Sequence, residues 1–85
     1  MIRRIAHTAF VVKDMEKSLH FYCNVLGFKR HFNLDLEGKP WIVYLKISDN
    51  QFLELFYGGE TNNEVSMNTV GYNHLCLEVD DIHEI

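Results

Sequence analysis

Three polar side chains that could bind a metal ion lie within apolar segments of this chain. His7 lies in RIAHTAFVV, Glu54 in QFLELFY and His74 in YNHLCLEV. A carboxylate in such surroundings is costly to bury unless it is paired, hydrogen-bonded or coordinated. Imidazole nitrogen and carboxylate oxygen are ligands of Zn²⁺, Ni²⁺, Fe²⁺ and Mn²⁺. Together, His7, Glu54 and His74 therefore predict a site for a divalent metal ion.

Each of these residues also has a simpler explanation. A single histidine in a strand is more often hydrogen-bonded in the core or at a sheet edge, and a single glutamate most often faces solvent. The metal hypothesis depends on the combination, because His7 and His74 occupy equivalent places in IAHTAFVVKDMEKS and YNHLCLEVDDIHEI. In both segments an aspartate that can cap a helix, Asp14 or Asp81, follows the histidine strand. This similarity predicts two modules that begin alike, with a strand and then a helix.

The other residues that could take part in chemistry are expected to have structural roles or to lie at the surface. Three further histidines are expected at the surface: His20, His31 and His83. Glu78 is expected at the rim of the cavity that His74 would line. The two cysteines lack CxxC spacing and are expected to be reduced thiols: Cys23 and Cys76. Four aromatic residues are expected mostly in the core, with some of them lining an apolar pocket: Trp41, Tyr44, Phe52 and Phe56.

The elements that would position these residues can be read from the apolar periodicity. Four segments read as strands: residues 4–12, 28–36, 41–47 and 51–57. A helix follows Asp14, because Met15, Leu19, Tyr22 and Leu26 form one apolar face and Gly27 is a suitable C-terminal stop. The predicted order is therefore β-α-β-β-β, an α+β arrangement.

A second unit is predicted to begin after this module. Residues 1–58 form the first module, 59–70 a polar connection, and 71–85 the start of the second module. In that start, 71–79 reads as a strand and Asp81 begins a helix, with Glu84 at capping-box spacing. A helix of so few residues is not stable alone. We therefore expect the second module to be truncated in this sequence.

Composition limits the classes of partner. The chain has 85 residues, 47% of them hydrophobic, and 12 acidic against 8 basic residues, for a formal charge of −4. The basic residues form no cluster that could neutralise phosphates, so nucleic acid is not expected as a partner. No segment approaches the roughly 20 apolar residues that span a membrane. Reduced cysteines and the lack of a recognisable signal peptide favour a cytoplasmic protein.

Several of these segments resemble the vicinal oxygen chelate superfamily, which includes glyoxalase I, bleomycin-resistance proteins and extradiol dioxygenases. The resemblance is carried by HTAFVVKDMEKSLHFYCNVLGFK, FLELFYGG and GYNHLCLEVDDI, and most specifically by the stretch from Asp14 to Phe28. It covers nearly the whole chain. It implies the glyoxalase/bleomycin-resistance fold, in which two βαβββ modules form a half-open curved sheet with the metal on its concave side.

The resemblance also implies a ligand set and a reaction. In glyoxalase I-like members the ligands are His, Glu, His and Glu, and His7, Glu54 and His74 match the first three. The fourth would lie beyond residue 85. Extradiol dioxygenases normally lack a carboxylate ligand at the Glu54 position, so Glu54 favours a glyoxalase-like lyase or isomerase. In such an enzyme the metal stabilises an enediolate and a carboxylate moves the proton. The resemblance gives this proton transfer to the fourth ligand, beyond residue 85, with Glu54 mainly a metal ligand and an assisting catalytic residue.

The alternatives implied by the resemblance concern the cofactor and the assembly. A bleomycin-resistance-type protein would bind a small molecule without metal in an aromatic groove, and an extradiol-type dioxygenase is a further possibility. The third alternative is that the chain is a fragment without activity of its own. Members of the superfamily pair modules within or between chains, so we expect a homodimer that binds a small-molecule substrate.

Overall fold

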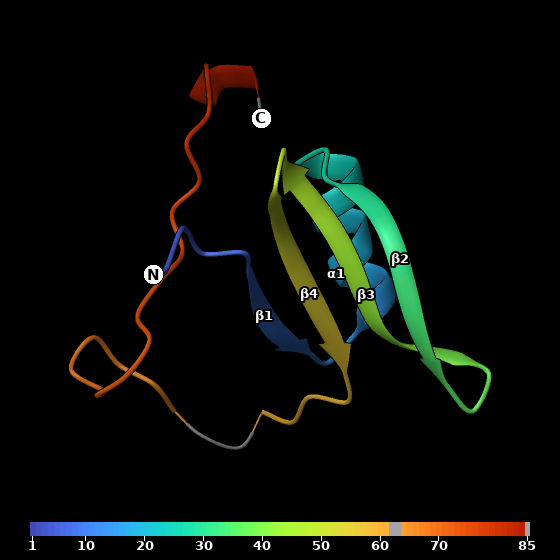
Figure 1. Ribbon diagram of the computed structural model, residues 1–85. Helices are drawn as coiled ribbons and strands as arrows, with labels where there is room; N and C mark the ends of the chain where they lie inside the picture. Colours follow the sequence, from blue (N-terminus) through green and yellow to red (C-terminus); the bar gives the residue numbers. More distant parts are fainter. Residues whose placement is uncertain (62–63, 85) are drawn as a thin grey trace.

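The computed structural model describes residues 1–61 and 64–84. Its core is a four-stranded sheet with a helix on one face, and a long C-terminal segment runs beside it (Figure 1). The elements are β1 (His7–Val12), α1 (Met15–Leu19), the π-helix η1 (His20–Val25), β2 (Lys29–Leu36), β3 (Lys39–Ser48), β4 (Gln51–Tyr57) and the 3₁₀ turn η2 (Ile82–Glu84). The order β-α-β-β-β confirms the α+β class and the βαβββ module predicted from the sequence.

The sheet has the strand order β1-β4-β3-β2. Strands β2, β3 and β4 form an antiparallel meander, whereas β1 joins parallel to β4. The first and last strands of the module are therefore neighbours. Two tight turns connect the meander, and the positive φ angles at Glu37 (53°), Gly38 (78°) and Asn50 (63°) are typical of such turns.

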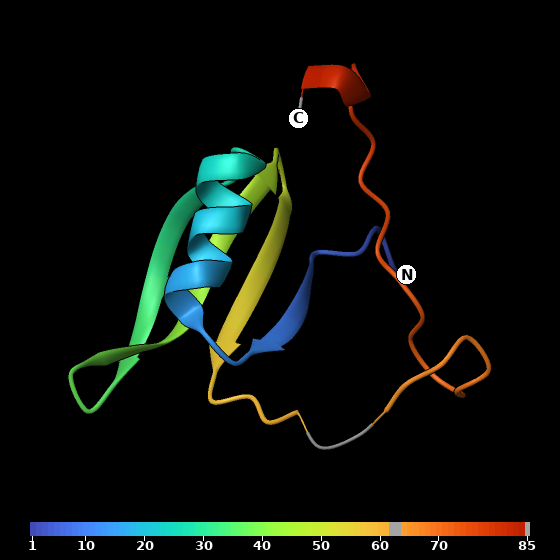
Figure 2. The ribbon, with the colours of Figure 1, turned by 180° about the vertical axis from the view of Figure 1, so that it is seen from behind.

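Alternation along the strands separates a buried face from an open one. Val43, Leu45, Leu53 and Leu55 are all fully buried against the helix. Figure 2 shows the helix lying across this face of the sheet. Alternating residues point to opposite faces of a strand, so Glu54 faces the other way. The open face is the one that can carry a site.

The helical segment begins at the residue predicted from the sequence. Asp14 is the N-cap, and its side-chain oxygen accepts a hydrogen bond from the backbone N–H of Lys17 at 3.1 Å. The segment continues as η1, where Leu26 N–H bonds to the Phe21 carbonyl. Gly27, with a φ of 83°, follows the last helical turn and allows the chain to turn into β2.

Replacing Asp14 with Ala is expected to lower the free energy of unfolding by about 1 kcal/mol, because the Lys17 N–H loses its acceptor. Urea denaturation followed by circular dichroism measures this change. Asp49→Ala is the control, because Asp49 lies in an exposed turn, where its carboxylate is 3.3 Å from the Lys46 ammonium and 95% exposed. An equal loss in both variants would contradict the capping role of Asp14.

Two strand predictions need correction. Residues 4–6, expected within the first strand, precede β1 without pairing. Residues 71–79, predicted as a strand from their alternation, are not assigned to any strand. A strand requires a neighbouring strand to satisfy its backbone groups, and among the residues described none pairs with this segment. The predicted helix start at Asp81 is a 3₁₀ turn, in which the Asp81 side chain accepts from the His83 N–H at 2.9 Å.

Within residues 1–61 and 64–84, no helix is long and apolar enough to cross a membrane.

Candidate functional site

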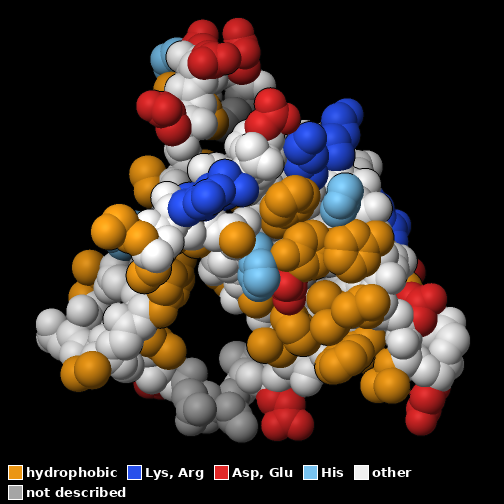
Figure 3. Space-filling model, in the orientation of Figure 1, with side chains coloured by type: hydrophobic (Ala, Val, Ile, Leu, Met, Phe, Trp, Pro, Cys, Tyr) orange, Lys and Arg blue, Asp and Glu red, His pale blue; other side chains and the backbone are white. Residues whose placement is uncertain are grey.

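The open face of the sheet carries an aromatic floor. The rings of Phe32 and Tyr44 are stacked with centroids 4.7 Å apart, and Phe52 lies 5.5 Å from Tyr44. At the other end of β4, Trp41 packs edge-on against Phe56 at 6.0 Å. Figure 3 shows hydrophobic side chains gathered over this face, with His and acidic side chains among them. Polar groups on this floor have apolar neighbours, which strengthens electrostatic interactions between them.

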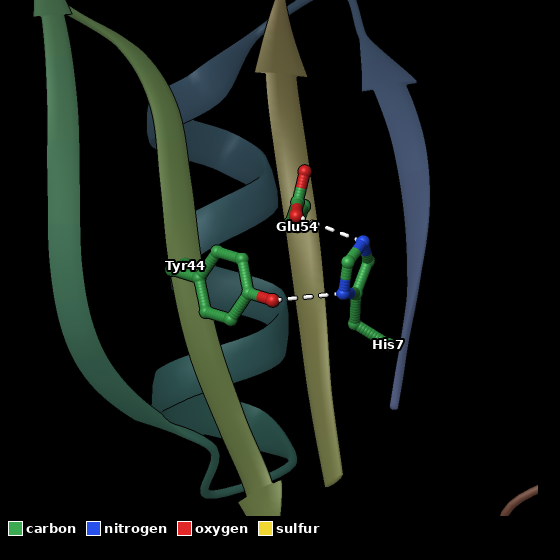
Figure 4. A network of polar contacts seen from close by, with 3 residues as sticks. All are labelled: His7, Tyr44 and Glu54. Carbon is green, nitrogen blue, oxygen red and sulfur yellow. Dashed lines mark hydrogen bonds and ion pairs between the residues drawn. The ribbon is translucent and has the colours of Figure 1, made fainter. Parts of the chain in front are cut away.

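His7 and Glu54, two of the predicted site residues, meet on this face. The His7 Nε2 atom lies 3.0 Å from the Glu54 Oε1 atom. The glutamate side chain is only 15% exposed, and the histidine side chain is 44% exposed. The two side chains come from the neighbouring strands β1 and β4 (Figure 4), and the exposure of His7 leaves the pair open to solvent on one side. A small ion or a substrate can reach it.

Tyr44 completes a three-residue network with this pair. Its hydroxyl lies 2.9 Å from His7 Nδ1, so both ring nitrogens of His7 have a partner. Desolvation by the surrounding rings, and then the Glu54 carboxylate, raise the pKa of the Tyr44 hydroxyl. The phenol therefore keeps its proton at neutral pH and can act as either donor or acceptor.

Strand register explains why these three residues meet. In the antiparallel β3–β4 pair, Tyr44 stands directly opposite Glu54. In the parallel β1–β4 pair, Glu54 is opposite Ala9, and His7 shares the face of Ala9 two positions earlier. The network thus depends on β1 and β3 lying on either side of β4. Tyr44 was expected mostly in the core, although its position opposite Glu54 across a hairpin could have identified it.

The His7–Glu54 pair fits one side of a divalent-metal site. Two ligands bound at about 2.1 Å to one ion lie roughly 3.0–3.4 Å apart, depending on the coordination angle. The observed 3.0 Å between Nε2 and Oε1 agrees with this spacing. Imidazole and carboxylate together are also a suitable donor set for the metals considered.

The third predicted ligand lies apart from this pair. His74 is exposed, and its Nδ1 atom lies 2.6 Å from the side-chain oxygen of Asn73. Across residues 1–61 and 64–84, no three His, Cys, Asp or Glu side chains are grouped as a metal site. The same segment nevertheless approaches β1, because a groove of about 440 Å³ is lined by His7 and Phe52 on one side and by Leu75 and Cys76 on the other. His74 as a ligand thus stays a prediction.

A second residue of the open face was not predicted. His31 was expected at the surface without a role, yet its ring lies 5.4 Å from Phe52. The β2–β3 register shifts between Arg30 and Phe32, which leaves His31 as the extra residue of a bulge. A bulge changes the alternation of side chains along a strand. The bulge thus brings His31 to the same side as its neighbour Phe32, with ring centroids 5.4 Å apart. All three histidines predicted at the surface are exposed: His20, His31 and His83.

Comparison with known proteins identifies the family. A sequence model of the Glyoxalase/Bleomycin resistance protein/Dioxygenase superfamily matches residues 4–85. The chain belongs to this superfamily. Membership agrees with the βαβββ topology and confirms the resemblance inferred from the motifs.

Two of the proteins to which the chain is similar are named lactoylglutathione lyase or probable lactoylglutathione lyase. The chain is 38% identical to a lactoylglutathione lyase of Neisseria meningitidis serogroup A over 85 residues, covering 95% of this chain and 60% of the relative. It is 32% identical to a probable lactoylglutathione lyase of Synechocystis over 83 residues, covering 93% of this chain and 62% of the relative. An uncharacterized protein of Escherichia coli, YaeR, is 28% identical over 83 residues, covering 95% and 64%. The chain thus spans about 60% of the length of these lactoylglutathione lyase relatives.

Proposed function

We propose that the full-length protein is a divalent-metal-dependent isomerase or lyase of the glyoxalase type, acting on a substrate with adjacent oxygen atoms. The observation that supports this most is the His7–Glu54 pair, whose 3.0 Å spacing suits two ligands of one ion. Similarity to proteins named lactoylglutathione lyase makes a glutathione hemithioacetal the first substrate to test.

In this proposal His7 and Glu54 hold one side of the metal, and His74 would supply a third ligand when residues 71–79 pack as a strand. The bound metal supplies a Lewis acid that polarises the adjacent oxygens of the substrate. Glu54 would act mainly as a ligand, and its carboxylate would assist a further carboxylate, beyond residue 85, in moving a proton between neighbouring carbons of the substrate. The aromatic floor excludes water from beneath the pair, which prolongs the life of a charged intermediate.

A second candidate function is metal-free binding of a small aromatic molecule, as in bleomycin-resistance proteins. The observation that favours it is the row of rings on the open face, including the stacked pair of Phe32 and Tyr44 at 4.7 Å. Stacked aromatic side chains provide large apolar contact area for a planar ligand. In this case the contact between His7 and Glu54 would be a hydrogen bond with no catalytic role.

Metal binding by the full-length protein separates the two functions. We expect the wild-type protein to bind Ni²⁺ or Zn²⁺ by calorimetric titration, and a chelator to abolish its isomerase activity. His74→Ala is expected to lower the metal affinity by at least about a hundredfold. This loss exceeds the usual loss of about 10- to 100-fold when a residue that only hydrogen-bonds to a metal ligand is removed. The control is His83→Ala, because His83 is exposed in η2.

The second candidate makes the opposite prediction. A wild-type protein that binds no divalent metal, and binds an aromatic ligand equally well with and without chelator, would replace the glyoxalase proposal with the metal-free one. Equal metal affinity in His74→Ala and His83→Ala would instead retain the metal and remove His74 from its ligands.

A further inference from the structure

We propose that Tyr44 is a positioning residue for His7, holding the Nδ1 atom of its ring both before and after a metal ion binds at Nε2. This inference rests on the proposed function, because it assigns a role beside the predicted metal ligands. Its basis is the network in Figure 4, in which Tyr44 Oη is 2.9 Å from His7 Nδ1 while Nε2 is 3.0 Å from Glu54.

The hydrogen bonds of the metal-free network follow from the chemistry of its members. An ionised carboxylate can only accept, whereas a neutral imidazole has one donor nitrogen and one acceptor nitrogen. The contact with Glu54 therefore places the ring proton of neutral His7 on Nε2. Nδ1 is then the acceptor, and the Tyr44 hydroxyl donates to it. The arrangement satisfies both ring nitrogens.

Binding of a metal reverses the direction of one of these hydrogen bonds. A ligating imidazole nitrogen must be unprotonated, so the ring proton has to move from Nε2 to Nδ1. Nδ1–H then needs an acceptor, and metal-bound histidines almost always have one. A hydroxyl both donates and accepts. Tyr44 can therefore serve both forms of His7 by rotating its O–H bond, without movement of either ring.

The surroundings of Tyr44 hold its ring while leaving the hydroxyl free to rotate. The ring is stacked on Phe32 at an interplanar angle of 12° and packs against Phe52, and the edge of His7 lies against it with centroids 5.6 Å apart. These contacts belong to the ring and not to the hydroxyl. A phenylalanine at position 44 would keep them and remove only the hydroxyl, with its hydrogen bond to His7 and its interaction with the Glu54 carboxylate. Tyr44→Phe is thus a specific probe of the proposed role.

The test compares metal affinity among wild type, Tyr44→Phe and the control Tyr57→Phe in the full-length protein. Tyr57 is 57% exposed at the end of β4, so its hydroxyl serves as a surface reference. Titration with Zn²⁺ should show an affinity about 10- to 100-fold lower for Tyr44→Phe, the usual effect of losing the partner of a ligating histidine. Tyr57→Phe should bind as the wild type does.

A second readout does not require metal. Nitrogen-15 NMR of His7 in the metal-free protein should show the proton on Nε2 in the wild type, with Nδ1 shifted by the hydrogen bond from Tyr44. That shift should be lost in Tyr44→Phe and kept in Tyr57→Phe. A residue that only supports the fold would change the unfolding midpoint and leave the Nδ1 resonance unaltered.

The outcomes separate this inference from the proposed function. Equal Zn²⁺ affinity in wild type and Tyr44→Phe overturns the positioning role while the metal site stands. If even the wild type binds no metal, the proposed function fails, and the metal-free spectra decide on Tyr44 alone. An Nδ1 resonance unchanged by Tyr44→Phe then overturns its role, and a shifted resonance supports the hydrogen bond that the role requires.

Discussion

Replacing Glu54 with Gln is expected to lower kcat/KM of the full-length protein by about a thousandfold or more, if the proposed isomerisation is the reaction. A metal site lowers the activation free energy by several kcal/mol, and each 1.4 kcal/mol corresponds to about a factor of ten in rate. The amide keeps the shape of the carboxylate but is neutral, binds a divalent metal less well and cannot accept the proton. The measurement is the rate of product formation from the glutathione hemithioacetal at fixed metal concentration.

Glu16→Gln is the matched control, because Glu16 is exposed in the first turn of α1, on the face of the sheet opposite the candidate site. Its activity should stay close to that of the wild type. The Glu54 side chain is 15% exposed on the aromatic floor, so the unfolding midpoint of Glu54→Gln must be measured as well. A folded Glu54→Gln protein with wild-type activity would exclude both a ligand role and a proton-transfer role for this residue.

The fold of residues 7–57 was largely predictable because its signals are local. Apolar alternation in QFLELFY gives β4 with the predicted bounds, and Leu53 and Leu55 are buried on the helix side as parity requires. Asp14 caps the helix and Gly27 follows it. Each of these signals depends on neighbours a few residues away, and local sequence determines such features.

The geometry of the candidate site was less predictable because it depends on non-local pairing. His7 and Glu54 were both identified from their types, but their contact requires β1 to lie parallel to β4. Tyr44 joins them only through the β3–β4 register. The bulge at His31 moves a residue to a face that alternation would not give it. Residue types and their positions in apolar segments thus suggested the metal ligands. The strand register and the β-bulge determine which side chains lie next to them.

Residues 71–79 show that a local pattern can predict a strand where no partner strand pairs with it. The alternation of Leu75, Leu77 and Val79 with polar residues predicts a strand, yet these three side chains are 37–42% exposed and none of the described strands pairs with them. Alternation gives one apolar face, and a strand forms only where a sheet offers both an apolar surface and free backbone groups. The division into modules at 1–58 and 71–85 therefore stays a prediction.

Replacing Leu53 with Ala is expected to lower the free energy of unfolding by about 2–5 kcal/mol, enough to unfold much of this module. Leu53 is fully buried in β4, in the cluster that includes Leu45, Met15 and Phe28. Removing its side chain loses transfer free energy and leaves a cavity that the surrounding residues fill only partly. Small domains have marginal stability, on the order of 5 kcal/mol at the low end. Urea denaturation followed by circular dichroism measures the loss.

Leu36→Ala is the matched control for the core, because it makes the same chemical change at the end of β2, where the side chain is 56% exposed. Its effect should stay within about 0.5 kcal/mol, as for most surface substitutions. A loss of stability in Leu36→Ala as large as in Leu53→Ala would mean that the open face is itself buried in the full-length protein. In that case the aromatic floor beneath His7 and Glu54 would be covered, and the pair would be accessible only through a groove.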